Sequence, residues 1–543
     1  MIKIATTAQI RQIEAEADAS GLSYAELMKR AGQTIADRAL AFIQTLPPDE
    51  PPRVTVLVGK GNNGGDGLVA GRLIAEQSNA LVRFYLMERR NPDDLVFKAV
   101  SDAGLFVAYA HDDQRYRVLT QTIASADLII DALYGLGARL PLPADATALL
   151  ETVTAALQLS QIPPLDLLYT SEYDLPVLPH RRIIAVDCPS GVDCDTGAID
   201  DHTLIADETV TFIAVKPGLL MAPALRAVGA LTVAPLRVPD SLYAFKALNT
   251  RLVTADSARE LLPVRPFDGN KGTYGSILIV GGSENYIGAP GLAARAAYRC
   301  GAGLVTVASI EKVIAALAPT NLEVTWLHCP AEAGKLASDA LPLLRAPLDS
   351  VNVLVIGCGL GQSDDLRALV VALLDIGRSR DLPTVIDADA LNMLAQTERF
   401  WEHLPPRAVL TPHPGEMARL TGMSVAAIQA DRLNIARKYA ADWGTTVLLK
   451  GAHTVIADSD RVSVLPFKTS ALAKAGTGDV LAGAIGAFAH TVFTIHDAAV
   501  IAGFLHGAAG HSASRRWGGT RSALASDVIE NFGTVMHQLE HSV

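Results

Sequence analysis

The feature that most constrains the fold is an alternation, along most of the chain, of short apolar runs with segments of helical periodicity. The runs are rich in β-branched residues and end at Gly, Asp or Pro, which is typical of strands buried on both faces of a sheet. Strands that alternate with helices form parallel sheets, so the sequence predicts an α/β protein. In chain order the predicted strands are RVTVLVG, LVRFYLME, ADLIIDALYG, RRIIAVD, ETVTFIAV, SILIVGG, GLVTVAS, VNVLVIGCG, PTVIDADAL, AVLTPHPGE and TVLLKGAHTVIA.

Length and pattern together predict two domains. A chain of 543 residues exceeds the roughly 250 to 300 residues that one hydrophobic core usually organises. The alternation lapses between Pro239 and Leu252, so we predict domains at residues 1–240 and 252–543, each a three-layer α/β domain. The stretch Leu157–Arg182 holds four prolines and no sustained period, which predicts a long surface loop or insertion in the first domain.

Composition argues against several classes of function. The net charge of −11 and the pI near 5.6 are unfavourable for binding nucleic acid, whose phosphates attract basic surfaces. The five cysteines form no CxxC pair, so we expect reduced thiols and a cytoplasmic location. The N-terminus lacks the apolar core of a signal peptide, and His490, His496 and Asp497 interrupt the most apolar stretch. We therefore expect neither a secretion signal nor a membrane span.

A glycine-rich turn follows the first of the predicted strands. In VTVLVGKGNNGGDG, Gly59, Gly61 and Gly64 have the spacing G-x-G-x-x-G between a strand and a helix. Such turns let backbone N–H groups approach a phosphate at the start of the helix. Glu88 ends the next strand, where a ribose-binding acid would lie. The alternative is that the glycines only close a tight turn, because a single match to this pattern is weakly specific.

Three acidic residues mark a cleft in the first domain. Asp66 follows the glycine-rich turn, and Asp131 and Asp187 each end a predicted strand. The carboxyl ends of parallel strands meet at one edge of the sheet, so these carboxylates are expected to share a cleft. Either a cation lies among them, or one of them has a raised pKa and can exchange protons. The alternative is that Asp131 and Asp187 cap the helices that follow their strands.

The motifs NNGGDG, LYGLG and VDCPSGVD, preceded by IRQIEAEA and LMKRAG, resemble the N-terminal domain of the bifunctional NAD(P)H-hydrate repair enzymes from about Ile10 to Pro235. The resemblance implies a Rossmann-like domain that interconverts the R and S forms of NADH or NADPH hydrated at C6. It also implies a potassium ion held by Asn63, Asp131 and Ser190, whose hard oxygen donors suit such a cation. Epimerisation needs proton transfer, for which Asp187 is the expected acid/base. The implied substrate contacts are Asn62, Asn63, Gly64, Gly65, Asp66, Gly135, Leu136, Gly137, Ala138, Arg139, Leu140, Pro141 and Asp187.

The stretch KAGTGDVLAG indicates an anion site in the second domain. Gly476, Thr477 and Gly478 precede a long apolar helix, so their N–H groups should point out of its N-terminus toward a phosphoryl group. Asp479 follows them in the first turn, where an acid can instead serve only to stabilise the helix dipole. Lys450, which ends the strand in LLKGAHT, favours the nucleotide-binding interpretation.

The motifs KGTYG, VIDADAL, TPHPGE, LLKGAHT and GTGDVLAG resemble the ribokinase-like superfamily, specifically its NAD(P)H-hydrate dehydratase branch, over nearly all of Thr254–His541. Two departures are that Cys358 stands where the family commonly has Pro, and that KAG precedes TGD where small hydroxyl residues are usual. His413, between two prolines, is alternatively only a turn residue. The resemblance implies hydrate contacts at Ala289, Gly359, His413 and Asp479, and adenine-nucleotide contacts at Lys450, Gly451, Ala452, His453, Thr454 and Gly478.

Together the resemblances imply a two-step repair of hydrated NADH or NADPH. The first domain would epimerise the hydrate. The second would phosphorylate the S form from ADP or ATP with Mg²⁺, using Asp479 as the base and His413 to position the substrate, and would then eliminate phosphate. One alternative is a small-molecule kinase, for example for a vitamin precursor alcohol, whose first domain binds a nucleotide-like regulator. Another is a first domain that only binds or assembles. The sequence leaves the choices of ADP or ATP and of NADH or NADPH open, and we expect a homo-oligomer without nucleic-acid partners.

Overall fold

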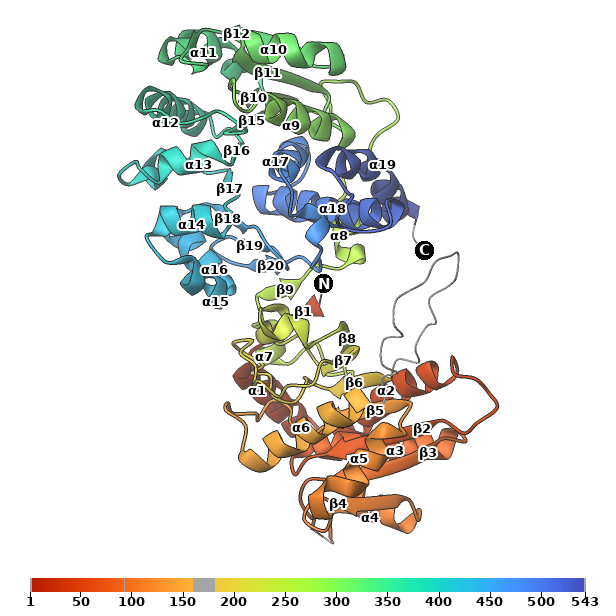
Figure 1. Cartoon of the computed structure of the whole chain (residues 1–543). Helices are drawn as coiled ribbons and strands as arrows, with labels where there is room; N and C mark the ends of the chain where they lie inside the picture. The colour runs from red at the N-terminus through yellow and green to blue at the C-terminus, as the bar shows by residue number, and fades with distance from the viewer. Residues whose placement is uncertain (1, 92, 160–180, 542–543) are drawn as a thin grey trace, which may run out of the picture. The chain divides into compact units, whose positions relative to one another are not determined.

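The computed structural model describes residues 2–91, 93–159 and 181–541 (Figure 1). The chain folds into two compact units, an N-terminal unit, Lys3–Leu248, and a C-terminal unit, Asn249–Val543 with the first two residues. The division between them falls inside the stretch Pro239–Leu252, where the sequence alternation lapses. The loop or insertion predicted for Leu157–Arg182 lies, apart from its ends, outside the described residues.

The N-terminal unit is built on a parallel sheet whose strand order is β4-β3-β2-β5-β6-β7-β8. The chain runs from β2 outward to one edge and then from β5 outward to the other, which is the Rossmann order. Ligands bind where such a sheet changes direction, here at the carboxyl ends of β2 and β5. The strands are β2 (Arg53–Val58), β3 (Leu81–Leu86), β4 (Phe106–Tyr109), β5 (Leu128–Ala132), β6 (Arg182–Val186), β7 (Glu208–Phe212) and β8 (Ala230–Ala234).

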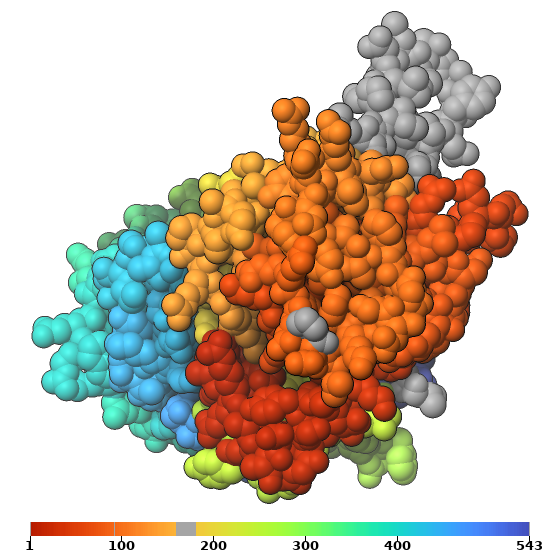
Figure 2. Space-filling model, turned by 90° about the horizontal axis from the view of Figure 1, so that it is seen from below, coloured from red at the N-terminus to blue at the C-terminus, as the bar shows by residue number. Residues whose placement is uncertain are grey.

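Helices cover both faces of this sheet, so the unit has three layers. Alternate strand residues enter two separate cores, one shared with α1 to α4 and the other with α5 and α6. This double burial explains why most strand positions are apolar or β-branched. Figure 2 shows a face of the unit on which α1 (red) and the segment from β3 to α5 (orange) form the surface. The helices are α1 (Thr7–Ala19), α2 (Tyr24–Ile43), α3 (Asn62–Gln77), α4 (Leu95–Asp102), α5 (Arg117–Ala124), α6 (Ala144–Leu159) and α7 (Tyr243–Lys246).

The C-terminal unit contains a larger sheet, in which the order from β9 is β9-β20-β19-β18-β17-β16-β15-β10-β11-β12. The strands from β18 to β12 are parallel, whereas β18, β19 and β20 pair antiparallel. The strands are β9 (Thr250–Leu252), β10 (Ser276–Val280), β11 (Leu304–Ile310), β12 (Thr325–Cys329), β15 (Val353–Ile356), β16 (Thr384–Ile386), β17 (Ala408–Leu410), β18 (Thr446–Leu449), β19 (Val455–Ala457) and β20 (Val462–Val464). The short β1 (Ile2–Lys3) adjoins β9 at the edge of this sheet, and β13 (Ala331–Glu332) and β14 (Lys335–Leu336) form a separate antiparallel pair.

Two helical layers enclose this sheet as well. Helices α8, α9, α17, α18 and α19 share one core with alternate strand residues, and α11 to α14 and α16 lie on the opposite face (Figure 1). The predicted α/β fold with parallel sheets is therefore confirmed in both units. Within the described ranges, no helix is long and apolar enough to cross a membrane. The helices are α8 (Ala255–Leu261), α9 (Gly288–Arg299), α10 (Glu311–Leu317), α11 (Leu341–Ser350), α12 (Asp364–Ser379), α13 (Asp389–Leu394), α14 (Pro414–Thr421), α15 (Val425–Ala430), α16 (Arg432–Trp443), α17 (Thr477–Phe488), α18 (Ile495–Arg516) and α19 (Ala525–His541).

Candidate functional site

The glycine-rich turn of the N-terminal unit joins β2 to α3. A Cβ atom on Gly59 would lie 1.8 Å from the carbonyl oxygen of Leu133, and one on Gly64 would lie 2.0 Å from that of Gly59. These two glycines therefore allow close backbone packing, as the structural alternative proposed. Helix α3 begins after Gly61 without a side-chain cap, which leaves its first N–H groups available to a ligand. Glu88, the expected ribose-binding acid, instead pairs with Lys60 across 3.2 Å.

Asp131, Ser190 and Asn63 lie at the carboxyl ends of β5, β6 and β2. Asp131 is fully buried and accepts hydrogen bonds from the N–H of Ser190 at 2.8 Å and from its hydroxyl at 2.6 Å. Burial raises the pKa of Asp131, and the Ser190 hydrogen bonds oppose that rise. Among the described residues, no ion pair neutralises this carboxylate. A buried, uncompensated carboxylate beside a hydroxyl fits a bound cation.

The Asn63 side chain lies beside the segment that follows β5. A Cβ atom on Gly135 would lie 2.8 Å from Asn63 Oδ1. In the part of the chain that the structure describes, Asn63 Nδ2 is enclosed and has no hydrogen-bond partner. The structure thus brings Asn63 close to the segment 135–141, both predicted contacts of the hydrate. An unpartnered polar atom here is compatible with a ligand group that completes its bonding.

Asp187 forms a buried ion pair with Lys216. Its Oδ1 accepts hydrogen bonds from Lys216 Nζ, from the Thr211 hydroxyl at 3.2 Å and from the N–H of Phe212 at 3.1 Å. Lys216 is fully buried, and its ammonium also donates to Thr211 Oγ1 at 2.9 Å and to the Phe212 carbonyl at 3.0 Å. Asp187 itself has a φ of 64°, in the left-handed region. The donors that hold this carboxylate come from one strand and the segment after it.

Two further carboxyl groups line a cavity of about 470 Å³ beside this ion pair. Asp66 and Asn62 line it from α3 and Glu14 lines it from α1, together with Phe212. Burial raises the pKa of Asp66 well above its ordinary value, and the charge of Asp187 adds to the rise. Burial and the charge of Asp187 also raise the pKa of Glu14. The cavity therefore places two carboxyl groups of raised pKa close to the carboxylate that pairs with Lys216, as expected for clustered acids. The segment 135–141 does not line this cavity.

In the C-terminal unit, α17 begins at the predicted anion-binding loop. Gly476 precedes the helix with a φ of 86°, and the Thr477 hydroxyl donates to the carbonyls of Leu472 and Lys474, both at 2.8 Å. A Cβ atom on Gly478 would lie 3.5 Å from both Asp387 Oδ2 and Lys450 Nζ. The start of α17 thus lies against a charged cluster, and its first N–H groups have no side-chain cap.

The charged cluster joins three strand ends to α17. Lys450, after β18, donates to Asp387 Oδ1 at 2.7 Å and lies 3.8 Å from Glu416 Oε2. Burial, followed by the charge of Asp387, raises the pKa of Asp479 to about 6. A hydrogen bond with the Cys358 thiol and the charge of Lys450 oppose that rise. Asp479 can therefore act as a base near neutral pH, beyond a role at the helix dipole.

His413 caps the start of α14. Its Nδ1 accepts a hydrogen bond from the N–H of Gly415 at 2.9 Å, and Glu416 accepts one from the N–H of His413 at 2.7 Å. Burial lowers the pKa of His413, so its Nε2 carries the remaining proton of a neutral ring. The turn role considered for His413 is therefore present, and its Nε2 lies 3.5 Å from Glu416 Oε1. Ala289 and Gly359 adjoin each other, since a Cβ atom on Gly359 would lie 2.9 Å from that of Ala289.

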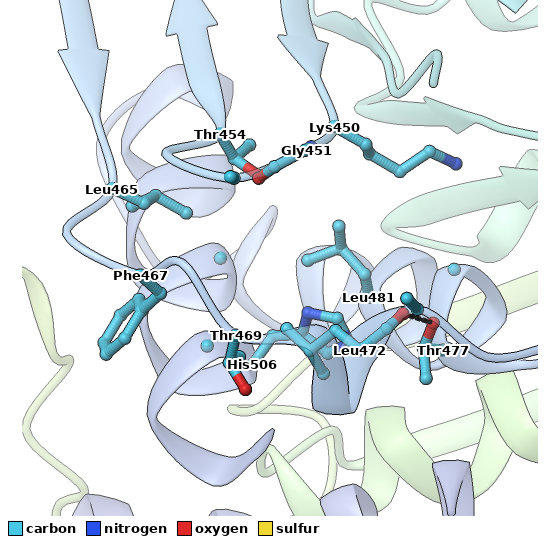
Figure 3. Close-up of a pocket in the computed structure, with 15 residues that line it drawn as sticks. Lys450, Gly451, Thr454, Leu465, Phe467, Thr469, Leu472, Thr477, Leu481 and His506 are labelled. Atoms are coloured by element: carbon cyan, nitrogen blue, oxygen red, sulfur yellow. Dashed lines mark hydrogen bonds between the residues drawn. The ribbon is translucent and has the colours of Figure 1, made fainter. Parts of the chain in front are cut away.

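A cavity of about 210 Å³ opens between the β18–β19 turn, the loop before α17 and helix α18 (Figure 3). Five of the six predicted nucleotide contacts line it, the exception being His453. The His453 ring is buried and its Nδ1 lies 3.0 Å from the Leu465 carbonyl, so this side chain serves the hairpin. The cavity-lining residues that were predicted to contact the nucleotide are Lys450, Gly451, Ala452, Thr454 and Gly478.

The structure adds five residues that sequence reasoning did not assign. Asp387 lies in the motif VIDADAL and Glu416 in the motif TPHPGE, so their positions after predicted strands could have indicated that they belong to the site. His506 interrupts an apolar segment of helical periodicity, which the sequence also shows, but the sequence does not indicate the chemical role of its ring. Glu14 lies in the quoted segment IRQIEAEA and Lys216 follows the predicted strand ETVTFIAV, but only the fold brings them to the cleft. The five are Glu14, Lys216, Asp387, Glu416 and His506.

Family comparisons match both units. Residues 277–531 match the family described as NAD(P)H-hydrate dehydratase, and residues 24–218 match the family described as YjeF-related protein N-terminus. The ADP/ATP-dependent NAD(P)H-hydrate dehydratase of Bacillus subtilis, co-crystallised with ATP/Mg²⁺, is 31% identical, with a TM-score of 0.45, over 53% of this chain and 98% of its own.

Full-length relatives cover both units at once. The bifunctional NAD(P)H-hydrate repair enzyme Nnr of Moorella thermoacetica is 38% identical over 95% of this chain and 93% of its own length. The Escherichia coli protein of the same name is 33% identical over 97% of this chain and 93% of its own length. The chain therefore belongs to the family of bifunctional NAD(P)H-hydrate repair enzymes.

Proposed function

We propose that this chain repairs hydrated NADH and NADPH in two steps. The N-terminal unit interconverts the R and S hydrates, and the C-terminal unit dehydrates the S form with ADP or ATP. The proposal rests on the observation that one chain of this family contains two sites. The first is a cavity lined by carboxyl groups, and the second is the uncapped start of α17 beside Asp479, whose pKa is raised. Full-length relatives make the alternative of a vitamin-precursor kinase the weaker interpretation.

In the epimerase site, Asp187 is the proposed proton-transfer residue. Lys216 pairs with it, and Asp66 offers a neighbouring carboxyl group with a raised pKa that can hold the proton in transit. Epimerisation reverses the configuration at the carbon that bears the hydroxyl, so a proton must move to and from the reacting centre. Asn62 to Asp66 and the segment 135–141 are the proposed hydrate contacts.

The proposed potassium ion belongs beside Asp131. Its oxygen donors would be Asp131, Ser190 and Asn63, and the ion would supply the positive charge that the buried carboxylate lacks. In this role it fixes the loop after β6, which also carries Asp187. The residues of this chain still perform the proton transfer.

In the dehydratase site, Asp479 removes the proton of the C6 hydroxyl, and that oxygen takes a phosphoryl group from ADP or ATP. The N–H groups at the start of α17 stabilise the charge on the transferring group. Phosphate then leaves with loss of a proton from the neighbouring ring carbon, which restores the double bond. His413, Ala289 and Gly359 position the hydrate. Mg²⁺ would neutralise nucleotide phosphates beside Asp387 and Glu416.

The proposed nucleotide site is the cavity between β18 and α17. Lys450 and Gly478 lie at its charged end, and Leu465, Phe467 and Leu481 form an apolar wall that suits a nucleoside. We also propose a homo-oligomer in the cytoplasm, where the five cysteines would remain reduced, as they are in the structure.

A racemic hydrate tests the proposal directly. The full-length protein, given racemic NADH hydrate with Mg²⁺ and ADP or ATP, is expected to restore all of the reduced-nicotinamide absorbance. Full recovery requires both activities, because the dehydratase alone would stop near half. Omitting the nucleotide is the control and should leave the hydrate unrepaired. A stable phosphorylated product without absorbance recovery would instead identify a kinase.

Dehydration is expected to fall as the pH drops below about 6, the raised pKa of Asp479. A base must be deprotonated to act, so activity is present above this pKa and is lost below it. Cys358→Ala removes a hydrogen bond that lowers the pKa, so this loss should begin at higher pH. Cys358→Ser, which keeps a donor, should restore the wild-type profile. Rates with saturating S hydrate and nucleotide measure the effect, and superimposable profiles for all three proteins would contradict it.

A further inference from the structure

His506 lies in the wall of the proposed nucleotide cavity, which is lined by apolar side chains and by Thr454, Thr469 and Thr477. It is on α18, is 7% exposed and lines the cavity with Leu465, Phe467 and Leu481. Figure 3 shows its ring beside Thr469 and Leu472, across the cavity from the β18–β19 turn. Gly503 and Gly507 flank it on the same helix and leave room for Leu465 and Phe467. The helix thus presents one polar ring where small and apolar residues surround it.

The ring has unfilled hydrogen-bonding capacity. Its Nε2 has no hydrogen-bond partner among the described residues, and the ring interacts with the backbone of Thr477. Burial lowers its pKa to about 4, so the imidazole is neutral, with one N–H and one lone pair. If the N–H serves the Thr477 carbonyl, the other nitrogen is an acceptor. A buried polar group without a partner costs free energy, which a ligand donor would recover.

The position of the ring decides which part of a nucleotide it meets. Thr477 is the first residue of α17, where the proposal places the transferring phosphoryl group. In a nucleotide the ribose comes directly after the phosphates, and the base lies farther away. The side chains that are farther from the charged cluster, such as Phe467, suit the base. His506, which contacts Thr477, is therefore beside the sugar.

We propose that His506 is a specificity-determining residue that accepts a hydrogen bond from a ribose hydroxyl of the adenine nucleotide. This inference rests on the proposed function, because it assumes that the cavity holds ADP or ATP. It adds a selectivity for ribonucleotides over deoxyribonucleotides, set by the unpartnered nitrogen of one ring in the cavity wall. A site built to accept a hydroxyl proton discriminates strongly against an analogue without that hydroxyl.

Nucleotide analogues and His506 variants together test the inference. For the wild-type protein, replacing ADP with 2′-deoxy-ADP or 3′-deoxy-ADP should weaken binding of the magnesium nucleotide by about 5- to 100-fold for the hydroxyl that is recognised. His506→Phe, which keeps a ring of similar size, should weaken ADP binding by a similar factor and abolish the discrimination between ADP and its deoxy analogues. His506→Gln, which keeps an acceptor, should recover part of it. Calorimetric titration and the nucleotide KM of dehydration both report the effect.

Several outcomes would overturn the inference. Equal discrimination by the wild type and by His506→Phe would mean that the ring only packs α18 against α17. If His506→Phe instead changes the discrimination between ADP and inosine diphosphate, which lacks the adenine amine, the ring contacts the base and not the ribose. A drop in kcat with unchanged nucleotide binding would also exclude a role in recognition. Because binding is measured without turnover, a wild type that binds ADP but does not repair hydrate would refute the proposed function alone.

Discussion

Asp479→Asn is expected to lower the rate of S-hydrate dehydration by about 10²- to 10⁴-fold, the scale of a positioned proton-transfer group. Asparagine keeps the shape of the side chain but cannot take the hydroxyl proton. The nucleotide should still bind, since its proposed contacts are Lys450, Gly478 and the start of α17. The measurement is absorbance recovery from pure S hydrate at saturating nucleotide, beside direct titration of nucleotide binding.

A matched variant separates catalysis from helix stability. Asp364 is an exposed acid in the first turn of α12, in the same unit, so Asp364→Asn makes the same charge change at a helix start far from the cavity. Losing an acid that stabilises the helix dipole lowers the free energy of unfolding by about 0.3 to 1 kcal/mol. Asp364→Asn should therefore cost a little stability and leave the rate unchanged. Equal rates for Asp479→Asn and the wild type would remove Asp479 from the mechanism.

The strands that the sequence predicted are those buried on both faces. In β5 and β7 every residue is buried, and aliphatic or β-branched residues fill most of their positions. The edge strands β4 and β12 were not predicted, because each is partly exposed and mixes polar with apolar residues. TVLLKGAHTVIA looked like one run, yet it forms β18 and β19 around a turn at Gly451, whose φ of 151° favours glycine. Local pattern thus locates central strands better than edges and hairpins.

The candidate sites were predictable to the extent that parallel strands place their carboxyl ends together. That rule placed Asp131 and Asp187 at the same edge of the sheet and Lys450 beside the start of α17. It could not supply ion-pair partners, because those depend on side chains distant in the sequence. Lys450 and Asp387 are 63 residues apart, and Glu14 reaches the epimerase cavity from a helix that precedes the sheet. The effect of such partners on the pKa values of the site residues can therefore be derived only from the folded structure.

Asp187→Asn is expected to slow consumption of the R hydrate by about 10²- to 10⁴-fold while repair of the S hydrate continues at the wild-type rate. The S hydrate needs only the C-terminal unit, whereas the R hydrate must first be epimerised. Asparagine is preferable to alanine here, because residue 187 has a φ of 64° and Asn tolerates the left-handed region. Parallel assays with each pure epimer measure the two rates.

The buried ion pair requires a control for stability. Removing the charge of Asp187 leaves the Lys216 ammonium buried without its partner, which is destabilising in itself. Glu208→Gln breaks a comparable buried pair, with Arg38 and Arg182, at the opposite end of the same sheet. Both variants should lower the melting temperature of the N-terminal unit, but only Asp187→Asn should slow R-hydrate consumption at a temperature where both remain folded. If the two variants slow it equally, the effect is one of stability and the acid/base role belongs to another carboxyl group, for which Asp66 is the structural candidate. If Asp187→Asn slows both epimers equally, the division of labour between the two units is wrong.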